Sequence, residues 1–306
     1  MGQKIVMIGA TGFIGSSLVE MLSPDNELVI FTRNKNVIND TLMDKNVQFV
    51  GFTDPDEILI PALENCQVII NLAGSGIDNK RWTRSRKMEI LESRVQTLQK
   101  LSVIMERLNI YVELIIQASA IGYYGFSETL SYTEKDSCGE GFLAEIAQKW
   151  ENATFELRPF TQRLVVMRLG VVLSAKGGSF SKMIIPFHYF LGGRIGSGMH
   201  WFSWIHLQDV ERAVSYFIDN KQCDGVYNLV APFVVRQFEF AKMLGKHLQR
   251  PTFFTTPSFV INVIFGQMGN ELILQGTHAI PDRLMREGFK FQFPTLDDAL
   301  VQIIGK

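Results

Sequence analysis

The chain has 306 residues, 46% of them hydrophobic and 20% charged, with a formal net charge of −1. This balance predicts a globular protein with a sizeable core and argues against disorder. A near-neutral chain has no long-range field to attract a polyanion, so we expect no nucleic-acid partner. Cys66, Cys138 and Cys223 show neither disulfide nor zinc spacing, which favours reduced thiols in a cytoplasmic protein.

No membrane segment is expected either. Residues 4–8 run directly into a glycine-rich turn, so the start of the chain does not read as a signal peptide. The most apolar late stretch, residues 259–265, is far shorter than the roughly 20 residues that a spanning helix needs.

The first half of the sequence alternates between predicted strands and predicted helices. Continuously apolar runs, typical of strands buried on both faces of a parallel sheet, occupy residues 5–8, 28–31, 47–50, 68–72, 114–117 and 164–167. Helical periodicity occupies residues 13–22, 58–63 and 84–108. The alternation predicts an α/β fold, a Rossmann-like doubly wound parallel sheet, over residues 1–175.

The second half has a different texture. Glycines and aromatic residues mix over residues 177–204, and helical periodicity returns at 207–219, 236–248, 257–265 and 296–304. A short apolar run at 226–229 is expected to return to the sheet as a strand. We predict a smaller, mostly helical C-terminal cap over residues 176–306, with a small-molecule substrate in the cleft between cap and sheet. The oligomeric state stays open.

Three glycines separate the first strand from the first helix. Gly9, Gly12 and Gly15 follow the spacing that permits a sharp turn, close approach of backbone N–H groups to a diphosphate, and close helix–sheet packing. The N-terminus of the helix then faces the phosphate charge. A plain strand–helix turn is the alternative. The residues expected to contact a dinucleotide here are Gly9, Thr11, Gly12, Phe13, Ile14 and Gly15.

The end of the second strand indicates which dinucleotide is bound. An acidic residue there would favour NAD by accepting a hydrogen bond from the ribose 2′-hydroxyl. This chain has Thr32 and Arg33 instead, and a guanidinium can bind a 2′-phosphate. We therefore expect NADP(H), although Arg33 could also be a solvated loop charge. Leu72, Ala73 and Gly74, after the fourth strand, are expected beside the adenosine half.

These motifs resemble the extended short-chain dehydrogenase/reductase superfamily: GATGFIG at 9–15, TR at 32–33 and NLAG at 71–74. Further stretches are similar to its atypical YfcH-like epimerase family, namely RWT at 81–83, ESRV at 92–95, SAIGYYG at 119–125, WE at 150–151, WIH at 204–206 and the run over 250–289. Gln267 and the turn at 235–236 depart from the family pattern. The resemblance implies an NADP(H)-binding Rossmann domain. It puts Thr32, Arg33, Leu72, Ala73, Glu89, Arg94 and Val172 near the cofactor.

The usual acid–base pair of the superfamily, Tyr-x-x-x-Lys, is absent, because no tyrosine in the chain is followed four residues later by lysine. The candidate substitutes are Ser119, Tyr123 and Tyr124, at and after the end of the fifth strand. Each also has a structural interpretation, as a serine bonded to backbone or a packed tyrosine.

Five residues are candidates for the substrate cleft: Arg81, Trp82, Trp201, Trp204 and His206. A buried, hydrogen-bonded histidine and core tryptophans are the alternatives. Two functions therefore remain open. One is an NADP-dependent oxidoreductase or epimerase acting on a small polar substrate such as a nucleotide sugar. The other is a non-catalytic NADP(H) sensor. An interaction protein without cofactor is the weakest interpretation, because it leaves the glycine turn unexplained.

Overall fold

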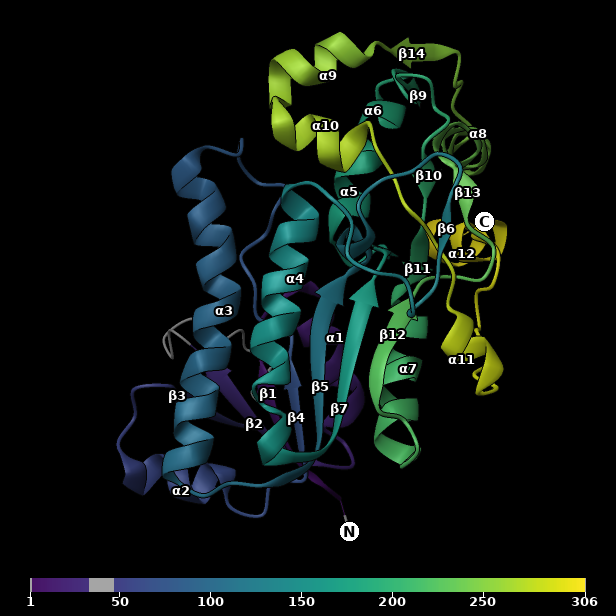
Figure 1. Ribbon diagram of the computed structural model, residues 1–306. Helices are drawn as coiled ribbons and strands as arrows, with labels where there is room; N and C mark the ends of the chain where they lie inside the picture. Colours follow the sequence, from purple (N-terminus) through teal and green to yellow (C-terminus); the bar gives the residue numbers. More distant parts are fainter. Residues whose placement is uncertain (1, 33–46, 306) are drawn as a thin grey trace.

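The computed structural model describes residues 2–32 and 47–305 (Figure 1). Seven parallel strands form the main sheet in the order β12-β7-β5-β4-β1-β2-β3. Their bounds are β1 (Lys4–Ile8), β2 (Glu27–Thr32), β3 (Val47–Gly51), β4 (Val68–Asn71), β5 (Val112–Ala120), β7 (Thr161–Leu169) and β12 (Gly225–Leu229). The prediction of a Rossmann-like doubly wound sheet is confirmed.

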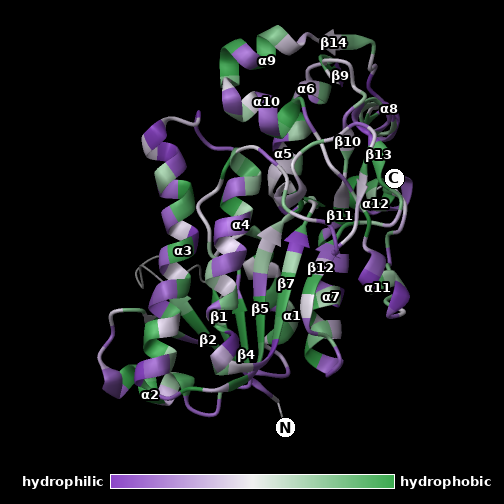
Figure 2. Ribbon diagram, in the orientation of Figure 1, coloured by the Kyte–Doolittle hydropathy of each residue, from purple (hydrophilic) through white to green (hydrophobic). Residues whose placement is uncertain are grey.

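Helices cover both faces of this sheet. Alternate strand residues pack against α1 (Phe13–Leu22) and α7 (Leu207–Asp219) on one face. The other residues pack against α2 (Asp56–Leu63), α3 (Arg84–Arg107) and α4 (Phe142–Phe155). Figure 2 shows the strands as the most continuously hydrophobic part of the molecule, as expected for strands buried on both faces.

The direction of winding reverses between β1 and β4. The chain steps from β1 outward to β2 and β3, and then returns to add β4, β5, β7 and β12 on the opposite side. In doubly wound sheets the loops diverge at such a reversal, so a ligand crevice is expected above the carboxyl ends of β1 and β4. The predicted cofactor residues of the first half flank this point.

The C-terminal part contains more β-structure than its periodicity predicts. Besides α7, which covers the main sheet, its helices are α5 (Ser179–Met183), α6 (Ile185–His188), α8 (Gln237–Leu248), α9 (Ser258–Phe265), α10 (Gln267–Ile273), α11 (Asp282–Arg286) and α12 (Leu296–Ile304). Two-stranded pairings join β8 (Val171–Leu173) to β11 (Trp204–His206), β9 (Gly193–Ile195) to β14 (Phe254–Thr256), and β10 (Trp201–Phe202) to β13 (Val235–Arg236). Strands this short carry too few residues for a period to be visible in the sequence.

One of these small pairings ties the end of the chain to the first half. β15 (His278–Ala279) pairs in parallel with β6 (Ser131–Tyr132), which lies in the long connection between β5 and α4. The 3₁₀ turns of the described residues are η2 (Ile121–Tyr124) and η3 (Arg158–Phe160). Over residues 2–32 and 47–305, no helix combines the length and apolar character required to cross a bilayer.

Candidate functional site

The turn between β1 and α1 is packed so closely that it requires glycine. Gly9 has a φ of +81°, and a Cβ there would lie 2.8 Å from the backbone nitrogen of Ala73. A Cβ on Gly15 would overlap the carbonyl oxygen of Gly9. The backbone of the turn therefore lies directly against the segment that follows β4, where any side chain would obstruct it.

The N-terminus of α1 is left without a cap from its own sequence. Gly12, the N-cap residue, offers no side-chain acceptor, and the first turn contains no acidic residue. The first N–H groups of a helix need an acceptor, and the helix dipole favours a negative one. Thr11 and Gly12 are exposed at this point, with Phe13 and Ile14 half-buried behind them. The turn therefore has the geometry of an anion cradle.

The opposite wall of the cradle is formed by the residues after β4. Leu72 donates its backbone N–H to the carbonyl of Ile8 (2.8 Å), and the backbone N–H of Ala73 donates to Oδ1 of Asn71 (3.0 Å). The Asn71 amide is in turn fixed because it donates to Oε1 of Gln117 (2.8 Å) on β5. Both contacts hold residues 72–74 beside the glycine turn.

Arg94 lies against this wall with an unpaired positive charge. A Cβ on Gly74 would be 3.0 Å from its Cζ, so only glycine leaves space for the guanidinium. Nη1 of Arg94 donates to the carbonyls of Ser75 (3.1 Å) and Ile90 (2.9 Å), and Cζ lies 4.8 Å from the ring centre of Trp150. Burial, and then the nearby Arg86 charge, lower the pKa of Arg94 to about 10.

No carboxylate of residues 2–32 and 47–305 lies within ion-pair distance of Arg94. A half-buried cation without a counter-ion is costly unless an anion binds beside it. Only the family resemblance singles out Arg94 in the sequence, because a helical arginine is ordinarily solvated.

The remaining predicted cofactor residues lie at the edges of the cradle. Glu89 is exposed and bonds Arg86 (2.6 Å) and the Ser75 hydroxyl (3.3 Å); the hydrogen bond from Arg86 lowers its pKa. Thr32 is the last residue of β2, and Arg33 falls outside the described residues. Val172 is half-buried on β8, where it pairs with Ile205.

A second polar group sits above β5 and β7, and its members satisfy one another. Ser119 Oγ donates to Oε1 of Glu151 (2.6 Å). Arg168 donates to the same carboxylate through Nε (2.8 Å) and Nη2 (2.7 Å), and both charged side chains are only 4% exposed. Arg168 Nη1 also donates to the Tyr124 hydroxyl (2.9 Å), which donates to Oδ1 of Asn228 (2.7 Å).

This group, the Glu151–Arg168 network, corrects part of the catalytic prediction. Tyr124 is 1% exposed, and burial raises its pKa to about 12. Its phenol is therefore buried and neutral. The Ser119 hydroxyl is likewise engaged by Glu151. Tyr123 differs, because its ring covers the Arg168 guanidinium at 3.5 Å while its hydroxyl has no hydrogen-bond partner among the described residues. Glu151 and Arg168 were not predicted, since charged residues rarely signal burial in a sequence.

Three predicted cleft residues are buried instead. Trp204 is fully enclosed in the core of the C-terminal part. His206 is 2% exposed: its Nδ1 accepts the N–H of Gln208 to cap α7, its Nε2 bonds Gln302 (2.9 Å), and burial lowers its pKa. Trp82 packs edge-on to Phe142 and donates to the carbonyl of Ile77 (2.8 Å). The cleft assignment is therefore wrong for these three side chains.

The other two cleft candidates reach the surface. The exposed Arg81 guanidinium lies against Gly266, between α9 and α10. Trp201 is half-buried, stacks on the His278 ring at 4.1 Å and lies 3.5 Å from the Arg236 guanidinium. Both side chains therefore contact residues of the C-terminal part.

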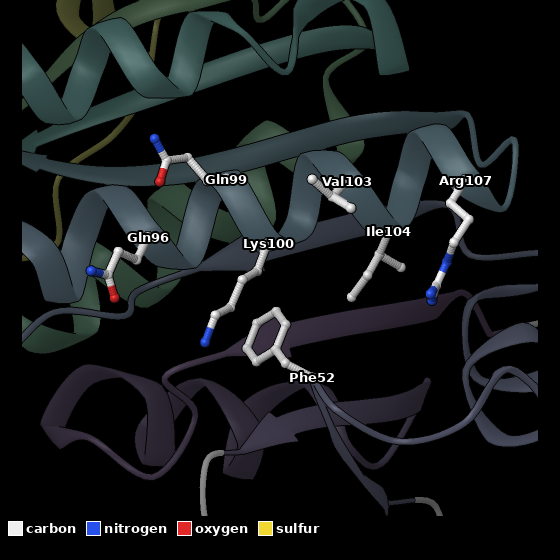
Figure 3. A pocket seen from close by; sticks show the side chains of 7 residues that line it. All are labelled: Phe52, Gln96, Gln99, Lys100, Val103, Ile104 and Arg107. Atoms are coloured by element: carbon white, nitrogen blue, oxygen red, sulfur yellow. The ribbon is translucent and has the colours of Figure 1, made fainter.

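Two surface hollows accompany these sites. One, of about 340 Å³, lies between Phe52 and the second half of α3, with Arg107 at its end (Figure 3). It includes no residue of the cradle. The other, of about 510 Å³, lies where α10 meets the connection between β5 and α4. Its lining is mostly polar: Tyr124, Phe126, Tyr132, Gly139, Glu140, Gly141, Asn270, Glu271 and Gln275. The described residues contain no cluster of histidine, cysteine or carboxylate side chains able to hold a metal.

Comparison with known proteins agrees with this architecture. The model of the NAD dependent epimerase/dehydratase family matches residues 5–229, and that of a domain of unknown function, DUF1731, matches residues 256–303. This chain belongs to the epimerase family. An epimerase family protein of Staphylococcus aureus is 34% identical over 99% of this chain and all of its own length. One of Staphylococcus saprophyticus is 35% identical over 98% of both chains.

Two solved structures are similar over almost the whole of this epimerase-family chain. The human epimerase family protein SDR39U1 (isoform 2), solved with NADPH, has a TM-score of 0.86 and 30% identity, covering 99% of this chain and 100% of its own. A nucleoside-diphosphate sugar epimerase from Corynebacterium glutamicum has a TM-score of 0.79 and 25% identity, covering all of this chain and 59% of its own.

Proposed function

We propose that this chain binds NADP(H) in the cradle and acts as an NADP(H)-dependent oxidoreductase or epimerase. The observation that carries the proposal is the unpaired Arg94 guanidinium beside an uncapped helix N-terminus, two features that both favour an anion. The diphosphate of a dinucleotide supplies the missing negative charge. The NADPH in the similar human structure supports the choice of cofactor.

Each part of the cradle has a proposed role. The glycine turn and α1 hold the diphosphate, and residues 72–74 hold the adenosine half. Thr32 and Arg33 at the end of β2 take the 2′-phosphate that distinguishes NADP from NAD. When bound, the nicotinamide supplies hydride transfer. The protein's contribution is binding, orientation and exclusion of water.

We propose a small polar substrate. The hollow beside α10 is lined mostly by polar side chains, including Glu140, Asn270 and Gln275. The name of the Corynebacterium relative supports a sugar nucleotide as one such substrate. Tyr123 is the candidate to move a proton, because its hydroxyl is free while those of Ser119 and Tyr124 are engaged.

Cofactor binding is tested by titrating the protein with NADPH and NADH, following the change in nicotinamide fluorescence. We expect NADPH to bind at least about tenfold more tightly, the difference of about 1.4 kcal/mol that one charge-assisted contact supplies. Equal affinity, or tighter binding of NADH, would overturn the NADP(H) assignment. Turnover is tested with carbonyl and sugar-nucleotide panels, and Tyr123→Phe should abolish any activity found while leaving NADPH affinity unchanged.

One observation favours a second function, a non-catalytic NADP(H) sensor. The superfamily acid–base pair is absent, and Ser119 and Tyr124 are held in a buried structural network. In a sensor, NADPH would change the affinity for a protein partner. Affinity capture with and without NADPH separates the two functions: a cofactor-dependent partner together with no turnover favours the sensor, and turnover favours the enzyme.

A further inference from the structure

A short segment of the chain is fastened at both ends across the crevice. Residues 176–182, which follow β8 and include most of α5, are called the strap here. Lys176 Nζ bonds Oε2 of Glu20 on α1 (2.5 Å). Lys182 Nζ bonds Oδ2 of Asp78 (2.8 Å) and Oδ1 of Asn79 (2.9 Å), in the loop after β4. The strap therefore joins the last turn of α1 to the loop after β4.

The middle of the strap lies on the first residue of α1. A Cβ on Gly178 would be 2.6 Å from Cε1 of Phe13, and one on Gly177 would be 3.5 Å from its Cδ2. Both glycines have positive φ, +145° at Gly177 and +76° at Gly178. Such a pair rotates at little steric cost, whereas the Phe13 ring fixes where the closed segment rests.

The position of the strap suggests its role. The middle of the strap lies against Phe13, the first residue of α1, and its Lys182 end is bound four residues beyond Gly74. Figure 1 shows α5, which begins within the strap at Ser179, above the carboxyl ends of the sheet. A ligand bound at the N-terminus of α1 would therefore lie close to this segment.

We propose that the strap closes over the bound dinucleotide and that the Lys182–Asp78 ion pair is its latch. This inference rests on the NADP(H) binding proposed above. The latch is suited to opening, because its side chains are 52% and 33% exposed and such a pair is weak and screened by salt. A latch formed with and without ligand obstructs entry and exit alike. It therefore controls rates more than affinity.

Stopped-flow fluorescence of NADPH tests the proposal with Lys182→Met. We expect both the association and the dissociation rate constants to rise about two- to fivefold, the range that an exposed ion pair allows, while Kd changes less than about twofold. Raising the salt concentration should bring the wild-type rate constants toward those of the variant. The double variant Asp78→Lys, Lys182→Asp should restore slow exchange.

Lys221→Met is the matched control. Lys221 bonds Glu113 (2.6 Å) with side chains 56% and 47% exposed, remote from the crevice, so both rate constants should stay at wild-type values. A rise in dissociation alone with weaker affinity would overturn the strap and assign Lys182 to direct contact with the ligand. Unchanged rate constants in Lys182→Met would also overturn it. Failure of every variant and of wild type to bind NADPH would instead overturn the proposed cofactor.

A measurement without ligand gives a second readout. Hydrogen exchange of residues 177–183 should be faster in Lys182→Met than in wild type and unchanged in Lys221→Met. Equal exchange in all three proteins would show that the ion pair does not hold the segment closed.

Discussion

Two regions at the carboxyl edge of the sheet differ in whether their polar groups have hydrogen-bond or ion-pair partners. Above β1 and β4, the cradle leaves the first N–H groups of α1 without a side-chain cap and the Arg94 charge unpaired. Above β5 and β7, the Glu151–Arg168 network pairs every charge and uses both Ser119 and Tyr124 to do so. Unsatisfied groups indicate a binding site, whereas satisfied groups indicate a structural role.

The contrast between the cradle and the Glu151–Arg168 network means that the position of a residue in the fold does not by itself assign its function. Ser119 and Tyr124 are predicted catalytic hydroxyls at and after the end of β5, but their hydrogen bonds point into the protein. Arg94 stands on a long helix, where a solvated side chain is the ordinary expectation, but its guanidinium is half-buried beside Ser75 without a carboxylate partner among the described residues. Four predictions test this contrast.

The largest expected effect is on stability, from Glu151→Ala. It leaves the Arg168 guanidinium buried and unpaired, which should lower the free energy of unfolding by about 3–5 kcal/mol. Urea denaturation measures it. Glu145→Ala on the same helix removes an exposed pair with Lys149 and should cost no more than about 0.5 kcal/mol. If Glu151→Ala instead kept its stability and lost NADPH binding, the network would be a ligand site and the comparison would fail.

The next effect is on cofactor binding, from Gly9→Ala. The added methyl would press on the backbone of Ala73, so NADPH affinity should fall by at least about 100-fold, or about 2.7 kcal/mol. Gly288→Ala is the control, because its φ of +83° matches but no atom lies within 4 Å. It should keep wild-type affinity and lose only about 1–2 kcal/mol of stability. Equal affinity losses in both variants would exclude a specific role for the close approach at Gly9.

Arg94→Met should separate binding from stability. Affinity for NADPH should weaken about 10- to 100-fold, because a charge-assisted contact is lost. Stability at pH 7 should be unchanged or higher, because burial of this unpaired charge lowers its pKa to about 10 and so opposes folding. Fluorescence titration and urea denaturation measure the two effects. A large loss of stability with unchanged NADPH affinity would mean that Arg94 stabilises the fold and does not contact the cofactor.

The smallest expected effect is on the pH dependence of protein stability, through the ionisation of Tyr124. Burial raises its pKa to about 12 from about 10, so the unfolded chain loses this proton first. The stability contributed by the neutral phenol is present below pH 10 and is lost between pH 10 and 12, at up to about 1.4 kcal/mol per pH unit. Tyr124→Phe should cost about 1 kcal/mol at pH 8 and show a shallower decline from pH 10 to 11 in urea denaturation. An unchanged slope would mean that the phenol is not buried in solution.

Several features could be predicted from the sequence because they depend on local pattern. Continuously apolar runs alternating with helical periodicity specify buried parallel strands with crossovers, and the sheet was predicted on that basis. The glycine turn was predicted because a backbone that must approach another backbone excludes a Cβ, and this requirement is visible as residue type. The predicted ends of α1 and α8 agree within a residue or two with the observed ends at Leu22 and Leu248, because helical periodicity is also a local pattern.

Which polar and aromatic side chains are left to face a ligand depends on tertiary packing and could not be predicted from the sequence. Trp204 and His206 read as cleft residues among glycines and aromatics, but the pairing of β11 with β8 buries both. The pairing of Glu151 with Arg168, and the strap from Lys176 to Lys182, join residues distant in the chain, and no local period encodes such contacts. The sequence thus determined the fold class and the site of the glycine turn, because both are short-range backbone constraints. The satisfaction of each buried charge was decided by tertiary packing, because it depends on neighbours that only the folded chain brings together.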